Sequence, residues 1–273
     1  MMEKIRRNER MSAMMKLLAS APSRIFTLNY FCSLFGSAKS TISEDIDALR
    51  HTVAAFDLGE IETITGAAGG VLYRPKVSKA GALSYIEQLS RRLSGSERVL
   101  PGDFLYYSDI LSAPDTVNRM GEILATAFYG LNPDFVLTME TKGIPVAYAT
   151  ANALGVPLVI ARHSSKVYEG SAVNINYVSG SGRIDTMSLS RRAVKENQRA
   201  LIVDDFLRGG GTARGMVDLM REFNIAVVGM GFVMATASPE KKRVSGEKAL
   251  MTLEVVPGEP ACAVVKPAPW LEN

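Results

Sequence analysis

The sequence has few of the residues that build disulfides and common metal sites. It contains two cysteines and two histidines in 273 residues. Cys32 and Cys262 lie far apart, form no CxxC pair, and have no metal-ligand spacing with His51 or His163. This pattern argues against a disulfide framework or a zinc site. It predicts reduced thiols and no metal held by protein ligands alone.

Long apolar runs and a strong net charge are also missing. No stretch approaches the roughly 18 apolar residues that a membrane span needs. The N-terminal segment has no apolar run followed by a small-residue cleavage site. We therefore expect a cytoplasmic protein with no membrane partner. The formal net charge of +3 is too small to indicate nucleic acid by itself, whereas 47% hydrophobic residues predict a sizeable core.

Positive charge is concentrated in the first 24 residues. Six basic side chains stand there against two acidic ones, Glu3 and Glu9. The basic residues are Lys4, Arg6, Arg7, Arg10, Lys16 and Arg24. Such a segment can contact phosphate, and it can equally be a solvated end of the chain.

The first 75 residues have the pattern of three short helices and a hairpin. Residues 11–18 carry apolar side chains at i, i+3, i+4 and i+7. A second helix is predicted from the N-cap Thr27 until Gly36, and a third over residues 39–50. Strand-like runs flank the sequence GAAGG. This order is typical of a winged helix, which reads DNA with its recognition helix; the alternative is a helical cap on a larger domain.

From residue 101 the pattern changes to alternating strands and helices. A polar helix at about 78–94 reads as a connector. Strands are predicted at 104–110, 135–140, 157–161, 200–205 and 227–235, with helices between them and an antiparallel excursion at 172–190. Such alternation predicts an α/β fold with a mostly parallel sheet covered on both faces. We expect two domains: a winged helix-turn-helix domain at 1–76 and this α/β domain at 77–273.

The sharpest local signal is ALIVDDFLRGGGTARG at 200–215. Asp204 and Asp205 end a buried strand, and the glycines at 209–211 lead through Thr212 into a helix. Ligands bind at the carboxyl ends of parallel strands, and glycines before a helix N-terminus suit an anion. The paired acids repel phosphate and suit sugar hydroxyls. The motif therefore predicts a ribose 5-phosphate site; the alternative is a glycine-rich turn with solvent-exposed acids.

The sequence IVDDFLRGGGT resembles the phosphoribosyl pyrophosphate (PRPP) motif of type I phosphoribosyltransferases. TMETKGIPVA at 138–147 looks like their pyrophosphate loop, and RHSSKVYEGS at 162–171 like their flexible loop. The resemblance implies binding of PRPP, with Mg²⁺. The implied contacts are Asp204, Asp205, Phe206, Leu207, Arg208, Gly209, Gly210, Gly211 and Thr212, with Glu140, Thr141, Lys142 and Gly143 at the diphosphate, and Arg162 and Lys166 from the flexible loop.

Over essentially its full length the chain resembles the purine-operon repressor of Gram-positive bacteria. The resemblance rests on SAKSTISEDI, GAAGGVLYRPK, TKGIP, KVYEGSAVNINYVSGS and VDDFLRGGGT. It implies a homodimer that binds double-stranded operator DNA and is released by PRPP. We expect phosphate contacts from Arg6, Arg7, Arg10, Lys39 and Arg74, and base contacts from Ser40, Thr41 and Ser43.

One departure from the transferases favours a sensor without catalysis. Gly209 stands where they commonly carry a threonine that helps hold the 5-phosphate, and the bulky Arg208 precedes it. Arg208 could hold a phosphate, and it could also crowd a purine base. An active purine phosphoribosyltransferase is the alternative from another class, and a general nucleotide-binding adaptor is a third.

Overall fold

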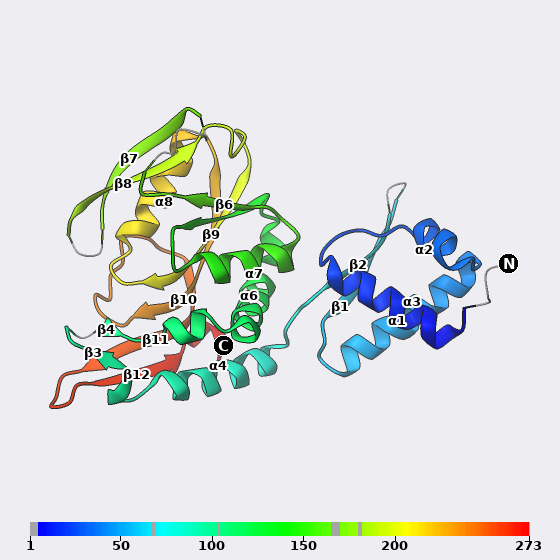
Figure 1. Ribbon diagram of the computed structural model, residues 1–273, viewed down its shortest axis with the longest axis horizontal. Coiled ribbons are helices and arrows are strands. Elements are labelled where there is room, and N and C mark those ends of the chain that lie inside the picture. Colours follow the sequence, from blue (N-terminus) through cyan, green and yellow to red (C-terminus); the bar gives the residue numbers. More distant parts are fainter. Residues whose placement is uncertain (1–4, 67–68, 103, 165–169, 180–181, 273) are drawn as a thin grey trace. The chain divides into compact units, whose positions relative to one another are not determined.

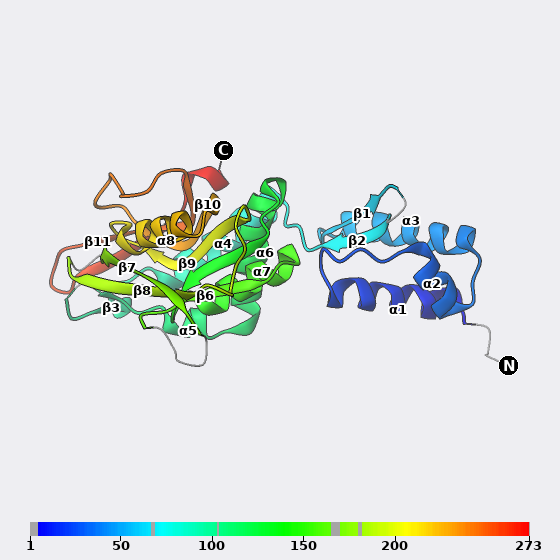
Figure 2. The same cartoon turned by 90° about the horizontal axis from the view of Figure 1, so that it is seen from above.

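The computed structural model describes residues 5–66, 69–102, 104–164, 170–179 and 182–272. The chain divides into two compact units, 1–78 with 152–155, and 79–151 with 156–273. Figure 1 and Figure 2 give two views of their elements. Among the described residues, no helix is both long and apolar enough to cross a membrane.

The first unit consists of three helices and a hairpin. The helices are α1 (Arg7–Ser20), α2 (Leu28–Phe35) and α3 (Lys39–Ala55). Strands β1 (Glu60–Ile64) and β2 (Gly70–Arg74) pair in antiparallel fashion, and α3 packs beside β1 (Figure 1). The predicted order of elements is confirmed.

Local sequence explains how α2 begins and ends. The Thr27 hydroxyl oxygen accepts a hydrogen bond from the Tyr30 backbone N–H at 3.1 Å, and Gly36 ends the helix at φ +59°. Such a cap satisfies a donor that the first helical turn leaves open, and glycine takes the left-handed conformation at no steric cost.

The helices and hairpin close over one core, formed by Met14, Leu18, Phe31, Phe35, Ile42, Ile46, Leu49, Val53, Ile61 and Val71.

The second unit is built on a six-stranded sheet of order β12-β11-β10-β9-β5-β6. Its strands are β5 (Phe135–Met139), β6 (Leu158–Ala161), β9 (Arg199–Leu207), β10 (Ala226–Thr236), β11 (Glu247–Val256) and β12 (Cys262–Pro267). All neighbours pair in parallel except β12, which runs antiparallel to β11. The predicted mostly parallel sheet is confirmed. Because β5 and β9 are neighbours, their carboxyl ends meet at one edge.

Both faces of the sheet are covered. On one face, Ile202 of β9 shares a buried cluster with Met216 of α8 (Gly211–Glu222) and Met187 of the antiparallel pair β7 (Ala172–Val178) and β8 (Ile184–Ser190). On the other, Gly231 of β10 lies against the Phe128 ring of α6 (Pro114–Phe128), where a Cβ would come within 2.9 Å of a ring carbon. Helices α7 (Ile144–Leu154) and α4 (Lys79–Leu93) complete the unit.

Two parts of this unit differ from the prediction. Residues 104–110 do not form a strand of the six-stranded sheet. They give the two-residue β4 (Phe104–Leu105), paired with β3 (Val99–Leu100), and the single-turn helix α5 (Ser108–Leu111). The ion pair of Asp109 with Arg98, at 2.8 Å, joins that turn to the segment before β3. Strands β11 and β12 had no predicted counterpart.

Candidate functional site

Asp204 and Asp205 occupy the carboxyl-terminal part of β9, and they differ in environment. Asp204 is buried, with 7% of its surface exposed, whereas Asp205 is half-buried. One Asp204 oxygen accepts the Asp205 backbone N–H at 3.0 Å. Burial, and then the charge of Asp205, raise the pKa of the Asp204 carboxyl above its ordinary value of 3.8. A buried acid beside a second acid suits a ligand that donates hydroxyl hydrogens.

A glycine turn follows β9 and opens α8. Gly210 adopts φ +78° at the N-cap position of α8, and a Cβ on Gly211 would lie 2.1 Å from the carbonyl oxygen of Val178. Gly209 has open space around its Cβ position. The turn borders a cavity of about 180 Å³, lined by Asp204, Phe206, Leu207, Arg208, Gly209, Gly210, Gly211, Thr212, Ala213 and Phe232. The first-turn N–H groups and the helix dipole favour an anion there.

The segment after β5 lies against the acid pair. A Cβ on Gly143 would come within 1.8 Å of an Asp204 carboxylate oxygen and 2.7 Å of the Thr138 hydroxyl, so this position has room only for glycine. Thr141 and Lys142 beside it are exposed. The chain thus brings the two sequence motifs, about 60 residues apart, into direct contact.

Glu140 faces the segment after β6. One of its carboxylate oxygens accepts the His163 backbone N–H at 2.7 Å, and the other pairs with Arg162 at 3.3 Å. These contacts, the His163 hydrogen bond first, lower the pKa of Glu140. Glu140 and Arg162 therefore hold each other in this arrangement. Lys166, the other cation expected from the flexible loop, lies outside the described residues.

Tyr107 belongs to this site, although sequence reasoning did not single it out. Its hydroxyl donates to an Asp205 carboxylate oxygen at 2.6 Å. Its ring stacks on Phe206 at 5.9 Å and lies 5.1 Å from the Lys142 ammonium. Burial, and then Asp205, raise the pKa of the phenol. The run FLYY, which contains Tyr107, could have pointed to this residue, but its aromatic residues led to the prediction of a strand.

The connection from β10 to β11 also packs on the glycine turn. The Arg243 backbone N–H donates to the Gly209 carbonyl oxygen at 3.0 Å, and the Lys242 ammonium donates to the Thr236 carbonyl oxygen at 2.7 Å. Burial lowers the pKa of Lys242. A pocket of about 930 Å³ adjoins this region, with aromatic residues Phe104, Tyr106, Tyr107 and Phe206 and cations Lys142 and Arg208 in its lining.

In the first unit, most residues expected to contact DNA lie at the surface. Lys39, Ser40 and Ser43 are exposed on the first turns of α3, and Thr41 is half-buried. Arg6 is exposed, and its backbone N–H is capped by Glu9 at 2.8 Å. Arg74 pairs with Glu62 at 3.2 Å, so a phosphate would compete with that ion pair.

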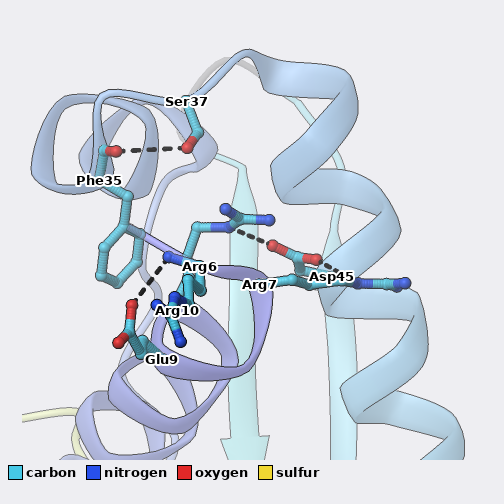
Figure 3. A network of polar contacts seen from close by, with 7 residues as sticks. All are labelled: Arg6, Arg7, Glu9, Arg10, Phe35, Ser37 and Asp45. Carbon is cyan, nitrogen blue, oxygen red and sulfur yellow. Dashed lines mark hydrogen bonds and ion pairs between the residues drawn. The ribbon is translucent and has the colours of Figure 1, made fainter. Parts of the chain in front are cut away.

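Arg10 is the exception and corrects the expectation that it contacts phosphate. Its side chain is only 8% exposed and pairs with Asp45 of α3 at 2.5 Å (Figure 3). Asp45 is 1% exposed and also pairs with the largely exposed Arg7 at 3.0 Å. Arg10 follows the buried face of α1, together with Met14 and Leu18. Arg10 links α1 to α3 inside the unit. Of the two arginines that pair with Asp45, Arg7 is the one at the surface.

Comparison with known proteins decides the family. Residues 6–75 match the model of the bacterial purine repressor N-terminal domain, and residues 107–264 match that of the phosphoribosyl transferase domain. The purine biosynthesis transcriptional repressor PurR of Bacillus subtilis (strain 168) is 41% identical, over 93% of this chain and 89% of the relative. The chain belongs to the bacterial purine repressor family. The purine biosynthesis transcriptional activator PurR of Lactococcus lactis subsp. lactis (strain IL1403) is 34% identical, over 92% of this chain and 93% of that relative.

The second unit of this purine repressor family member has the fold of a phosphoribosyltransferase. The crystal structure of adenine phosphoribosyltransferase from Thermoanaerobacter pseudethanolicus ATCC 33223 superposes with a TM-score of 0.54. It is 24% identical, and the match covers 61% of this chain and 99% of that one. Similarity at this level supports the fold, and the activity has to be argued from the residues of the site.

Among the described residues, no group of three or more His, Cys, Asp or Glu side chains could hold a metal ion. The two acids at 204 and 205 could contribute oxygen ligands to a cation whose remaining ligands came from water or from a bound molecule.

Proposed function

We propose that this protein regulates purine biosynthesis genes by binding operator DNA through its first unit, and that PRPP bound by the second unit releases it. The observation that carries the proposal is the acid pair beside a glycine turn, in a chain that also contains a winged helix. The names of two full-length relatives, a repressor and an activator of purine biosynthesis, support the gene class.

PRPP fits the second unit by the chemistry of its residues. The 5-phosphate would accept hydrogen bonds from backbone N–H groups of the glycine turn, at the positive end of α8. The ribose hydroxyls would donate to Asp204 and Asp205. The diphosphate would lie near Thr141 and Lys142, with its Mg²⁺ bound chiefly by phosphate oxygens. Tyr107 would have to share or give up Asp205, which links ligand binding to a movement of the aromatic segment.

DNA fits the first unit by shape and charge. Lys39, Ser40 and Ser43 lie together on the exposed start of α3, where a recognition helix presents side chains to base edges. Arg6 and Arg7 at the start of α1 supply cations for phosphate. We further propose a homodimer, because regulators of this type pair two such units on an operator of matching symmetry.

Repression is the sign of regulation that we propose, since the named repressor is more similar to this chain than the named activator is, at 41% against 34% identity. To act as an inducer, PRPP must bind the DNA-free state more tightly than the DNA-bound state. A coupling of about 1–3 kcal/mol would change DNA affinity by roughly 5- to 150-fold.

We also propose that the second unit senses PRPP without catalysis. Arg208 borders both the phosphate cavity and the large aromatic pocket, where its bulk would crowd an incoming base. Position 209 has space for a side chain, yet carries none that could add a hydroxyl to the phosphate. An assay for nucleotide formation from adenine, guanine, hypoxanthine and xanthine tests this point directly. Turnover of any of them would favour the enzyme.

Fluorescence anisotropy with a purine-operon control region, at fixed salt, tests the regulator. We expect tight binding that Mg²⁺–PRPP weakens. The double variant Asp204→Ala/Asp205→Ala should bind DNA normally and no longer respond to PRPP, whereas Asp115→Ala, an exposed acid at the start of α6, should behave like wild type. Release of the double variant by PRPP would refute the ribose role of the two acids.

A further inference from the structure

A groove of about 520 Å³ separates α3 from the hairpin of the first unit. One wall is the face of α3 that carries Lys39, Ser43, Asp47 and Arg50. The other wall is formed by residues 63–66 and 69–71 of the hairpin, and residues 27–29 at the start of α2 also line the groove. Within this groove Lys39 and Ser43 lie near the amino end of α3, and Arg50 lies about two turns further along.

Arg50 is the side chain that joins the two walls. Its Nε donates to the Ile61 carbonyl oxygen of β1 at 3.1 Å, and its Nη2 donates to the Thr63 hydroxyl oxygen at 2.7 Å. Its Nη1 pairs with Asp47 on α3. One planar guanidinium therefore makes three contacts in two elements, which the single ammonium of a lysine could not reproduce.

The hairpin depends on such attachments beyond its base. Ile61 of β1 and Val71 of β2 lie in the core, and Phe26 bridges to Val71. At the outer end of β1, Thr63 is exposed and Ile64 is half-buried, whereas Val71 and Gly70 opposite them on β2 are buried. A two-stranded hairpin is marginally stable by itself. Phe26 and the core hold β2, and Arg50 ties the outer part of β1 to α3 across the groove.

We propose that Arg50 is a positioning residue for DNA binding: it holds the hairpin at a fixed distance from α3 and neutralises Asp47 on the face that meets DNA. This inference rests on the proposed DNA-binding function of the first unit. Asp47 is 64% exposed, and without its partner it would present an unpaired negative charge beside Lys39 and Ser43.

The sequence of the hairpin gives the proposal a distinctive signature. Residues 64–71, ITGAAGGV, contain no lysine or arginine, so their contacts with DNA would be made by backbone and small side chains. Loss of those contacts should weaken binding without changing its salt dependence, because counterion release follows the number of phosphates neutralised by cations. A direct phosphate contact by Arg50 would have the opposite signature.

The experiment measures operator affinity of the full chain across a salt series for five variants. Thr63→Val removes one Arg50 contact with no change in charge. Arg50→Lys keeps the charge but replaces the planar guanidinium, with its several N–H donors, by a single ammonium. We expect each to bind about 3- to 10-fold more weakly with an unchanged salt slope. The double variant should be no weaker than Arg50→Lys, since both changes break one linkage. Thr52→Val is the matched control, because its hydroxyl donates within α3, to the Ala48 carbonyl oxygen.

Two outcomes would overturn the proposal. If Thr63→Val and Arg50→Lys bind as wild type does, the linkage has no role in recognition. If Arg50→Lys retains affinity while Arg50→Met lowers the salt slope by about 0.9, Arg50 contacts phosphate directly. Urea unfolding followed by circular dichroism identifies the folded variants used for comparison. Failure of wild type to bind the operator would count against the proposed function and not against the linkage.

Discussion

Replacing Asp45 by asparagine should selectively destabilise the first unit. Both carboxylate oxygens of Asp45 are engaged, one by Arg10 and one by Arg7, and the side chain is 1% exposed (Figure 3). Asparagine keeps the shape and removes the charge. The guanidinium of Arg10, 8% exposed, would then stay buried between α1 and α3 with no opposite charge beside it.

The expected cost follows from the burial of each partner. Breaking a buried ion pair by removing one member costs about 3–5 kcal/mol, because the remaining charge is left uncompensated. The Arg7 pair adds at most about 1 kcal/mol, since Arg7 is 61% exposed and solvent screens it. Domains unfold at about 5–15 kcal/mol, so this single change should remove a large part of the stability of the first unit.

The single tryptophan makes the effect measurable unit by unit. Trp270 lies in the second unit, so its fluorescence follows that unit, whereas far-ultraviolet circular dichroism follows helices in both. In urea, Asp45→Asn should move part of the dichroism transition to lower concentration and leave the fluorescence transition in place. Glu44→Gln, the exposed neighbour on α3, should change either transition by less than about 0.5 kcal/mol.

The reasoning fails if Asp45→Asn is no more destabilising than Glu44→Gln. It also fails if both transitions move together, because the network would then stabilise the whole chain rather than one unit. A loss confined to the first unit should reduce DNA binding and leave PRPP binding intact.

Three further predictions concern the two binding regions. Arg7→Met should lower the salt slope of DNA binding by about 0.9, whereas Arg10→Met should leave that slope unchanged. Equal slopes for the two variants would mean that Arg10 contacts a DNA phosphate in the same way as Arg7. Gly143→Ala should weaken PRPP binding by at least about tenfold, measured by calorimetry, because its Cβ would lie 1.8 Å from an Asp204 oxygen; Gly130→Ala, with open space, is the control. The raised pKa of Asp204 means that the folded state binds this proton more tightly, so stability is lost as pH rises from about 3.8 toward the folded pKa. Asp204→Asn should therefore gain stability relative to wild type as pH rises through that window, in urea titrations followed by Trp270 fluorescence, and a difference independent of pH would contradict this.

Much of the fold could be predicted because local pattern and global structure agree in both units. The cap Thr27, the glycine at 36 and the spacing of Ile42, Ile46 and Leu49 all specify helices that the tertiary core then buries. The glycine turn was found in the same way, since its position after a buried apolar strand places it at the carboxyl edge of a parallel sheet.

The errors arose where tertiary contacts decide the role of a residue. Arg10 was taken as a surface cation, although its spacing of four and eight residues from Met14 and Leu18 already placed it on the buried face of α1. Nothing local predicts its partner Asp45, which lies 35 residues away. Tyr107 was missed for the same reason, because its hydrogen bond to Asp205 spans 98 positions.

The contact between Gly143 and Asp204 has a consequence for how such sequences can diverge. The space that a side chain at 143 would need is already filled by the carboxylate of 204, so position 143 cannot change freely while Asp204 is kept. A descendant that has lost the carboxylate at 204 no longer needs a glycine at 143. Substitutions at 143 should therefore accumulate only after 204 has changed. Paired loss at these two positions would therefore mark lineages in which the ligand is no longer under selection, even where the fold and the first unit persist.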